Sequence, residues 1–421
     1  MKYLSIIIYL LVTVILTGCS DRDKDNIFDP GSGITNIDLN LFVSTADSTV
    51  QIRWRPPQTV DFTGYKLYKK TEFENQFTLL SSFLKNQTSY QDTDIEYDIK
   101  YSYYLTLIGE NSDSPPTNIV EVMAGPGDIW LIDRWGLETF LNLAYDLKTV
   151  NLIVYGVWIP EALAFDHDHN RAMATYPTIN SFDIFDLENG EVLFSEFGIE
   201  NPFDCLYDRF NQSFWLTDSS GKLYEINPVT GTAALVATNL GNPIQIELSE
   251  EKLLFILDDR NHQILVYNLE GVLQYSLSAL ENQTLMDPEF FQIDQANQIL
   301  FLTDQTPVED ILYKYDLASG EAEEIYRSDN LGKFRIDEKN QTIWIIIFND
   351  INSEIMQLSY NGLRLSQRIG FISPSDLRIN PKNGNLIVSD TGTRLVKHFR
   401  SDSTLIGVFS NAIYPFKVFI E

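Results

Sequence analysis

A short block of apolar residues that ends in a polar residue recurs seven times between residue 126 and the end of the chain. Five copies (IWLID, FWLTD, LFILD, LFLTD and LIVSD) end at Asp133, Asp218, Asp258, Asp304 and Asp390, and two less regular ones (AMATY and IIIFN) end at Tyr176 and Asn349. Neighbouring copies end 40 to 46 residues apart. A fixed period of this length indicates one supersecondary unit that is repeated.

Each copy continues with the same succession of patterns. A second alternating segment, a turn that contains glycine and a third segment follow the block, as in LYEINPVTGTAALV (223–236). A further strand pattern, often led by proline, precedes most copies, as in NPFDCLYD (201–208) and DPEFFQID (287–294). Alternation predicts strands, and glycine supplies the positive φ of tight turns. Four antiparallel strands per repeat are typical of a β-propeller blade.

The last residues of the chain, YPFKVFIE (414–421), have the pattern of one more first strand. Six such strands lie between the seven blocks, and none precedes the block that ends at Asp133, because GPGDIW follows directly on the preceding segment. We therefore predict that YPFKVFIE pairs beside residues 129–133, closes a seven-bladed ring and leaves no exposed strand edge. The alternative, two stacked sandwiches, does not explain this strand.

The repeats resemble the NHL and YVTN class of propellers, which share first strands led by proline and second strands that end in Asp. The resemblance covers residues 126–421, and it implies an all-β ring whose first strands line a central channel.

Residues 34–125 carry a different pattern, in which short alternating segments are separated by turn clusters. The clearest segments are STVQIRW (48–54), GYKLYKK (64–70), YSYYLTLIG (101–109) and IVEVMA (119–124). This pattern predicts a β-sandwich. The stretch WRPPQTVDFTGYKLYKK resembles a fibronectin type III domain, with Trp54 in the second strand, Tyr65 at the start of the third and Tyr101 at the tyrosine corner. An immunoglobulin-like relative is the alternative.

The chain begins with an apolar run from Tyr3 to Leu16 that is too short to span a bilayer comfortably and has the proportions of a signal peptide. Its end, Leu16-Thr17-Gly18-Cys19, resembles the bacterial lipobox. The resemblance implies that residues 1–18 are removed and that the Cys19 sulfur receives a diacylglycerol. The alternative is an uncleaved short anchor.

Residues 19–33 are polar and rich in turn formers, so we expect a flexible tether. Ser20 after the lipidated cysteine resembles the outer-membrane sorting pattern of lipoproteins, and the acidic run resembles tethers of surface lipoproteins. We therefore expect the bacterial cell envelope, anchored by lipid, with the outer membrane or the cell surface favoured over the inner membrane.

The net charge narrows the range of partners. The chain has 30 basic and 59 acidic residues, a formal net charge of −29. This balance argues against nucleic acid, since phosphate binding needs clustered Lys and Arg. The two cysteines are Cys19 and Cys205, so lipidation of the first leaves no disulfide partner for the second.

Few residues of the sequence are candidates for catalysis or metal binding. His167 and His169 could bind a metal from one side of a strand, but they occupy the position of a turn in the other repeats. His262 also lies in a turn, and the repeated Asp of the blocks is expected to bond turns. Cys205 occupies an apolar register, so we expect a buried, unreactive thiol. We predict no catalytic residue, cofactor or metal.

Two registers of the first strands should face the channel. The second residues after the leading position are Ala162, Asp204, Gln245, Phe290, Lys333, Asp376 and Lys417, and the fourth are Ala164, Leu206, Glu247, Gln292, Arg335, Arg378 and Phe419. Four of the seven charged residues in this set are basic, in a chain with twice as many acids. This indicates either internal ion pairs, which we favour, or an anionic ligand.

These features favour a lipid-anchored envelope protein that uses a β-propeller to bind a protein or a glycan. The alternative is a propeller hydrolase or lyase that acts on a sugar or a lactone at the channel mouth.

Overall fold

The computed structural model describes residues 26–420 except 47, 48, 59, 135–139, 156, 157, 167, 281, 282 and 351. The chain divides into two compact units, Met1–Gly125 and Pro126–Glu421, both built from strands. Cys19 and the predicted signal peptide lie outside the described residues. Within the described part, no helix has the length and apolar character needed to cross a membrane.

The first unit contains two antiparallel sheets. One has the order β1 (Phe42–Ala46), β2 (Thr49–Arg53), β5 (Ser89–Asp92), and the other β4 (Thr78–Leu84), β3 (Gly64–Thr71), β6 (Lys100–Ile108), β7 (Val120–Met123). Side chains of both sheets share one core, which includes Ile52, Trp54 and Tyr65. The Tyr101 hydroxyl accepts a hydrogen bond of 2.7 Å from the Glu96 N–H.

The second unit contains four-stranded antiparallel sheets that follow chain order. They are β11 (Leu163–Asp166) to β12 (Arg171–Tyr176), β13 (Ser181–Asp186) and β14 (Val192–Phe197); β15 (Pro202–Asp208), β16 (Ser213–Asp218), β17 (Lys222–Ile226) and β18 (Ala233–Thr238); and β19 (Pro243–Leu248), β20 (Leu253–Asp258), β21 (Gln263–Asn268) and β22 (Leu273–Leu277). A short hairpin of β23 (Ala279–Leu280) and β24 (Gln283–Thr284) follows, and a 3-10 turn, η1 (Pro177–Ile179), joins β12 to β13.

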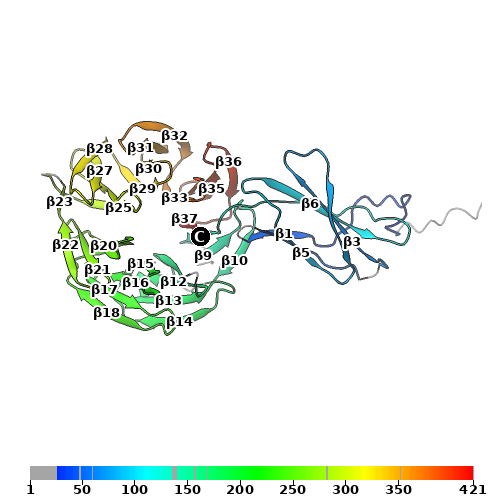
Figure 1. The fold of residues 1–421 in the computed structure, drawn as a ribbon, viewed down its shortest axis with the longest axis horizontal. Coiled ribbons are helices and arrows are strands. Elements are labelled where there is room, and N and C mark those ends of the chain that lie inside the picture. Colours follow the sequence, from blue (N-terminus) through cyan, green and yellow to red (C-terminus); the bar gives the residue numbers. More distant parts are fainter. Residues whose placement is uncertain are drawn as a thin grey trace, which may run out of the picture. The chain divides into compact units, whose positions relative to one another are not determined.

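Three more sheets continue the series in the same order. They are β25 (Pro288–Asp294), β26 (Ile299–Asp304), β27 (Asp310–Asp316) and β28 (Ala322–Ser328); β29 (Leu331–Asp337), β30 (Thr342–Ile347), β31 (Ser353–Ser359) and β32 (Arg364–Phe371); and β33 (Pro374–Ile379), β34 (Leu386–Asp390), β35 (Leu395–Phe399) and β36 (Leu405–Phe409). Figure 1 shows these sheets around a common centre, with β25, β29 and β33 on the inner side and β28, β32 and β36 on the outer side.

The remaining sheet joins the two ends of this unit. Its order is β10 (Val150–Val154), β9 (Phe140–Leu143), β8 (Ile129–Asp133), β37 (Pro415–Ile420). Strand β37 lies antiparallel to β8, with Val418 opposite Leu131. This is the pairing predicted from the sequence, and it places the last strand beside a strand almost 300 residues earlier (Figure 1).

The repeated blocks form the second strands, and their apolar runs are continuous because both faces are covered. Every residue of β8, β16, β30 and β34 is buried. The terminal Asp of several blocks accepts backbone N–H groups from the turn before the first strand, as Asp304 does from Met286 and Asp287. Asp133 does the same for Ile413 and Tyr414. The repeated Asp therefore has the structural role expected of it.

Candidate functional site

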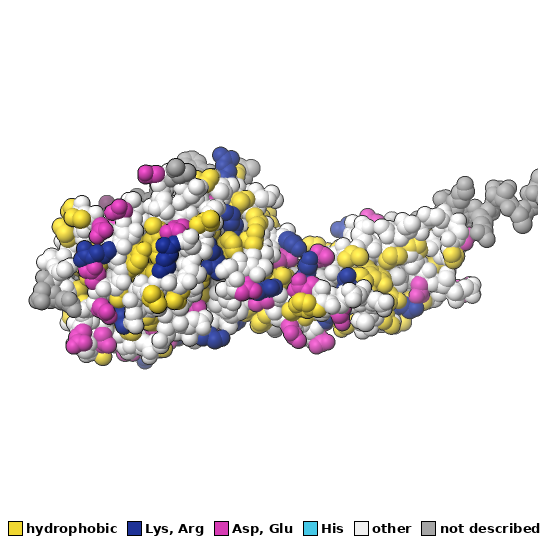
Figure 2. Space-filling view, turned by 90° about the horizontal axis from the view of Figure 1, so that it is seen from above, with side chains coloured by type: hydrophobic (Ala, Val, Ile, Leu, Met, Phe, Trp, Pro, Cys, Tyr) yellow, Lys and Arg dark blue, Asp and Glu magenta, His cyan; other side chains and the backbone are white. Residues whose placement is uncertain are grey.

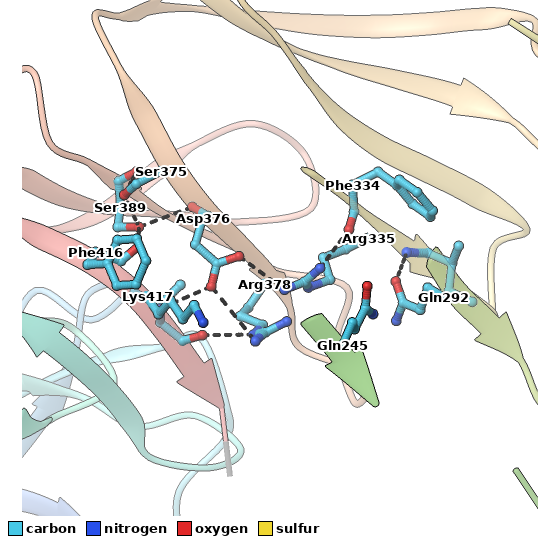
Figure 3. Close-up of polar contacts among 12 residues, drawn as sticks. Gln245, Gln292, Phe334, Arg335, Ser375, Asp376, Arg378, Ser389, Phe416 and Lys417 are labelled. Atoms are coloured by element: carbon cyan, nitrogen blue, oxygen red, sulfur yellow. Dashed lines mark hydrogen bonds and ion pairs between the residues drawn. The ribbon is translucent and has the colours of Figure 1, made fainter. Parts of the chain in front are cut away.

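The first strands of the second unit surround a cavity of about 830 Å³, which we call the central cavity. All nine polar residues that the sequence placed at the channel line it: Asp204, Gln245, Glu247, Gln292, Lys333, Arg335, Asp376, Arg378 and Lys417. Its volume lies in the range of small-molecule sites, about 300–1,000 Å³. Figure 3 shows polar contacts in this region and labels Gln245, Gln292, Arg335, Asp376, Arg378 and Lys417 of this set.

The alternation of each first strand explains which residues reach the cavity. Successive side chains point to opposite faces, so the second and fourth residues share one face and the third points into the layer between sheets. Ile246, Phe291 and Cys205 hold the third position and are buried. Burial raises the pKa of the Cys205 thiol, so the thiolate is disfavoured.

Sequence reasoning missed Glu161 and Glu289, which also line the cavity. Both directly follow the leading proline of a first strand, at Pro160 and Pro288. In β25 the pairing register shifts between Pro288 and Phe290, so Glu289 is an extra residue in a β-bulge. A bulge breaks simple alternation, and strict alternation therefore could not place this carboxylate.

Five acceptor side chains of the cavity wall connect neighbouring first strands. Each accepts the backbone N–H of a residue in the next first strand: Asp204 from Ile246 (3.1 Å), Gln245 from Phe291 (3.1 Å), Glu247 from Ile293 (3.0 Å), Gln292 from Ile336 (3.0 Å) and Asp376 from Val418 (3.2 Å). These bonds satisfy N–H groups on the inner edge of each sheet, where the ladder has no further strand. Part of the polar character of the wall is therefore structural.

Asp376 lies between two guanidinium groups. Its Oδ1 is 3.0 Å from Nη2 of Arg335, and its Oδ2 is 3.8 Å from Nη2 of Arg378. Arg378 also donates through Nε to the Val418 carbonyl at 2.7 Å (Figure 3). Burial alone would raise the pKa of Asp376, but the nearby positive charges, Arg378 first, outweigh it and the pKa is lowered. Asp376 is therefore a buried carboxylate that the two arginines keep ionised.

The two lysines of the cavity differ in their partners. Lys417 donates to the Glu161 carbonyl at 2.7 Å and lies 3.2 Å from its carboxylate. The Lys333 ammonium has no hydrogen bond or ion pair with any residue that the structure describes. Burial lowers the pKa of Lys333 to about 8, with Asp376 opposing this effect and Lys417 adding to it. The ion pairs favoured from the sequence thus exist for Asp376 and Lys417 but do not include Lys333.

The opposite side of the cavity carries carboxylates. Burial raises the pKa of Glu247 to about 8 and also raises the pKa of Asp204. A protonated Glu247 can donate a hydrogen bond at neutral pH. The cavity therefore combines a cationic side, formed by β29, β33 and β37, with a side of weakly ionised acids and amides on β15 and β19.

The histidines that the structure describes lie outside the cavity lining. His169 lies 2.8 Å from the Asp166 carboxylate in the turn after β11, and His262 lies 3.9 Å from Asp287. His398 is buried against the Tyr145 carbonyl at 2.7 Å, and His167 lies outside the described residues. The described residues include no cluster of three His, Cys, Asp or Glu side chains arranged to hold a metal ion.

The face drawn in Figure 2 has a different charge pattern from the cavity wall. On the face drawn in Figure 2, basic side chains are interspersed with acidic and apolar ones. In the cavity wall, four of the five basic residues come from three neighbouring first strands, β29, β33 and β37, and the fifth is Arg209 after β15.

Comparison with known proteins identifies the fold. No family model matches the chain, and no curated protein matches it. Solved structures do match: a functionally unknown protein of Desulfotomaculum acetoxidans (10% identity, TM-score 0.54, 70% of this chain and 98% of that one), a candidate 6-phosphogluconolactonase of Bacteroides fragilis (13%, 0.53, 70% and 98%) and the hydrazine synthase of Kuenenia stuttgartiensis (11%, 0.54, 71% and 93%). At these identities the likeness concerns the fold alone, and that fold is of the β-propeller type.

Proposed function

We propose that this chain is a lipid-anchored protein of the bacterial cell envelope that binds a protein or glycan partner through its propeller. In this proposal residues 126–421 form a seven-bladed ring that β37 closes, and residues 34–125 form a fibronectin type III-like spacer. The pairing of β37 with β8 supports the ring. The three-stranded and four-stranded sheets around one core, together with the bonded Tyr101 hydroxyl, support the spacer.

The central cavity is the observation that carries the binding function. It is a single polar space of about 830 Å³ at the place where propellers have their channel. Ligand sites are typically concave, with a few polar groups that converge. Capture of partners from envelope extracts with the full mature chain tests the proposal. A glycan or protein should be retained by the native chain and lost after heat unfolding; repeated recovery of nothing would refute it.

The anchor proposal rests on the lipobox-like sequence that ends at Cys19. A Cys19→Ala variant should lose incorporation of labelled fatty acid and accumulate as an uncleaved or soluble form, because the sulfur carries the lipid. Cys205→Ala is the matched control, since it removes the other cysteine, which is buried. Labelling that persists in the Cys19 variant would exclude this anchor. Protease treatment of whole cells then distinguishes a surface location from a periplasmic one.

A second candidate function is hydrolysis or lyase chemistry on a sugar or lactone. Glu247 and Lys333 favour it, because both have pKa values shifted to about 8 and line the same cavity. Groups that titrate near neutral pH are suited to general acid–base catalysis. The test is lactone hydrolysis by the full chain, compared with the Glu247→Gln variant. Equal rates in the two proteins, or a rate no higher than that of buffer, would eliminate this candidate.

A further inference from the structure

On the cationic side of the central cavity, basic side chains outnumber the carboxylates that form ion pairs with them. Lys333, Arg335, Arg378 and Lys417 line this side. Asp376 contacts both arginines, and the Glu161 carboxylate contacts Lys417. Glu161 is also shared with Arg134, a further cation that lies outside the cavity lining. Asp204 and Glu247 also act on these cations electrostatically, but neither forms an ion pair with them among the described residues. Partly buried charges without counter-charges are unfavourable, so the excess of cations over paired carboxylates suggests a missing anion.

The hydrogen-bonding capacity that remains in the cavity is mostly donor capacity. Lys333 donates to none of the described residues, and Nε of Arg335 is buried without a partner. Gln292 uses its carbonyl oxygen for the Ile336 N–H, while its amide nitrogen donates to none of the described residues. These groups suit a ligand rich in acceptors, because a lysine ammonium and a guanidinium have no acceptor atoms of their own.

Aromatic rings hold the two guanidinium groups in place. The Arg335 guanidinium lies over the Phe290 ring at 4.7 Å, and that of Arg378 over the Phe419 ring at 5.2 Å. Phe290 and Phe419 also line the cavity. Such stacking fixes a planar guanidinium before a ligand arrives, which reduces the entropy lost on binding.

We propose that the central cavity binds a small organic anion whose carboxylate or phosphate group contacts Lys333 between Lys417 and the Arg335–Asp376–Arg378 cluster. The inference rests on the proposed use of the cavity as a ligand site, and it specifies the chemistry of the ligand. The anion supplies a negative charge opposite the Lys333 ammonium and accepts hydrogen bonds from the free donors. The volume of the cavity, about 830 Å³, accommodates an acidic sugar or the acidic end of a glycan.

The test is calorimetric titration of the full-length lipidated protein in detergent at low salt. The probes are glucuronate, glucose 6-phosphate and inorganic phosphate, with neutral glucose and cationic glucosamine for comparison. We expect the anions to bind and both comparison sugars to bind at least about tenfold more weakly, since a charge-assisted hydrogen bond is lost. Comparison of the affinity for glucuronate with the affinities for glucose 6-phosphate and inorganic phosphate distinguishes a carboxylate ligand from a phosphate ligand.

Two variants locate the binding. Lys333→Met should weaken anion binding at least about tenfold without loss of the fold, because the ammonium has no hydrogen bond or ion pair with the described residues and contacts only the Phe416 ring, at 5.6 Å. Lys339→Met is the matched control, since Lys339 is exposed on the turn after β29 and lies outside the cavity lining. Its affinity should equal that of the unmodified protein.

The outcomes separate this inference from the proposed function. Anion binding that depends on Lys333 supports the inference. Glucose binding as tightly as glucuronate, or anion binding unchanged in Lys333→Met, overturns it and leaves a binding role for the cavity. Absence of anion binding at millimolar concentration also overturns it, while the capture experiment decides independently whether the propeller has a partner.

Discussion

Removal of the last strand tests whether the pairing of β37 with β8 stabilises the propeller. Val418 is completely buried, and Ile420 packs against the same core, which also contains Ile129 and Leu131 of β8. Burial of these two side chains contributes roughly 3–5 kcal/mol, a large share of a typical stability of about 5–15 kcal/mol. Deletion of residues 414–421 also leaves β8 with an unpaired edge.

The assay is thermal unfolding of the mature chain and of the Δ414–421 variant under the same conditions. A loss of about 3–5 kcal/mol corresponds to a fall in Tm of roughly 5–8 °C in a unit of this length, because the entropy of unfolding grows with the number of residues. We also expect the truncated protein to aggregate through the open edge. A detached C-terminal tail would contribute almost nothing, so a truncated protein that melts within about 2 °C of the full chain would refute the closure.

A pair of point variants gives the same test without removing the strand. Val418→Ala should lower the free energy of unfolding by about 2 kcal/mol, because it creates a cavity in a closed core. Val408→Ala makes the same chemical change in β36, where the side chain is 39% exposed, and should have a much smaller effect. Equal effects of the two variants would contradict the packing described for β37.

Three further predictions concern the charged groups of the cavity. Asp376→Asn keeps an acceptor for the backbone but leaves Arg335 and Arg378 without a counter-charge, so chemical denaturation should show a loss of about 3–5 kcal/mol; a neutral effect would contradict the buried cluster. The folded-state pKa of Glu247, about 8, lies above its ordinary value of 4.5, so Glu247 contributes stability at low pH that is lost between about pH 4.5 and pH 8. Glu247→Gln should flatten this fall in unfolding free energy, and an unchanged pH profile would show that Glu247 is not buried in the folded protein. The pKa of Lys333, about 8, lies below its ordinary value of 10.5, so Lys333→Met should stabilise the protein at pH 7. This gain in unfolding free energy should vanish as the pH rises from about 8 to 10.5. A loss of stability at pH 7 would contradict a Lys333 ammonium that has no ion-pair partner among the described residues.

Much of the propeller could be predicted from the sequence because its physics is local and repeated. Each second strand is buried on both faces, so its apolar run marks it, and the Asp at its end bonds the adjacent turn. Strand alternation then places the second and fourth residues of every first strand on the cavity side. Lys333 and Arg335 of β29 could therefore be assigned to the cavity without coordinates.

The parts that could not be predicted depend on the contacts between strands. The sequence alone does not show that Asp376 of β33 pairs with Arg335 of the preceding first strand, or that Lys333 has no ion-pair partner among the described residues. Lys333 and Lys417 are both lysines of the cavity wall, but only Lys417 has an ion pair, because the Glu161 carboxylate lies beside it. Glu289 escaped notice because the bulge after Pro288 changes its direction.

The most direct test of the account is an experimental structure of the full chain with glucuronate at a saturating concentration. We predict ligand density in the central cavity, with the carboxylate about 3 Å from the Lys333 ammonium. The propeller should close through the pairing of Val418 with Leu131. Glucuronate bound elsewhere on the chain, with the central cavity holding only solvent, would contradict the assignment of this cavity as the ligand site.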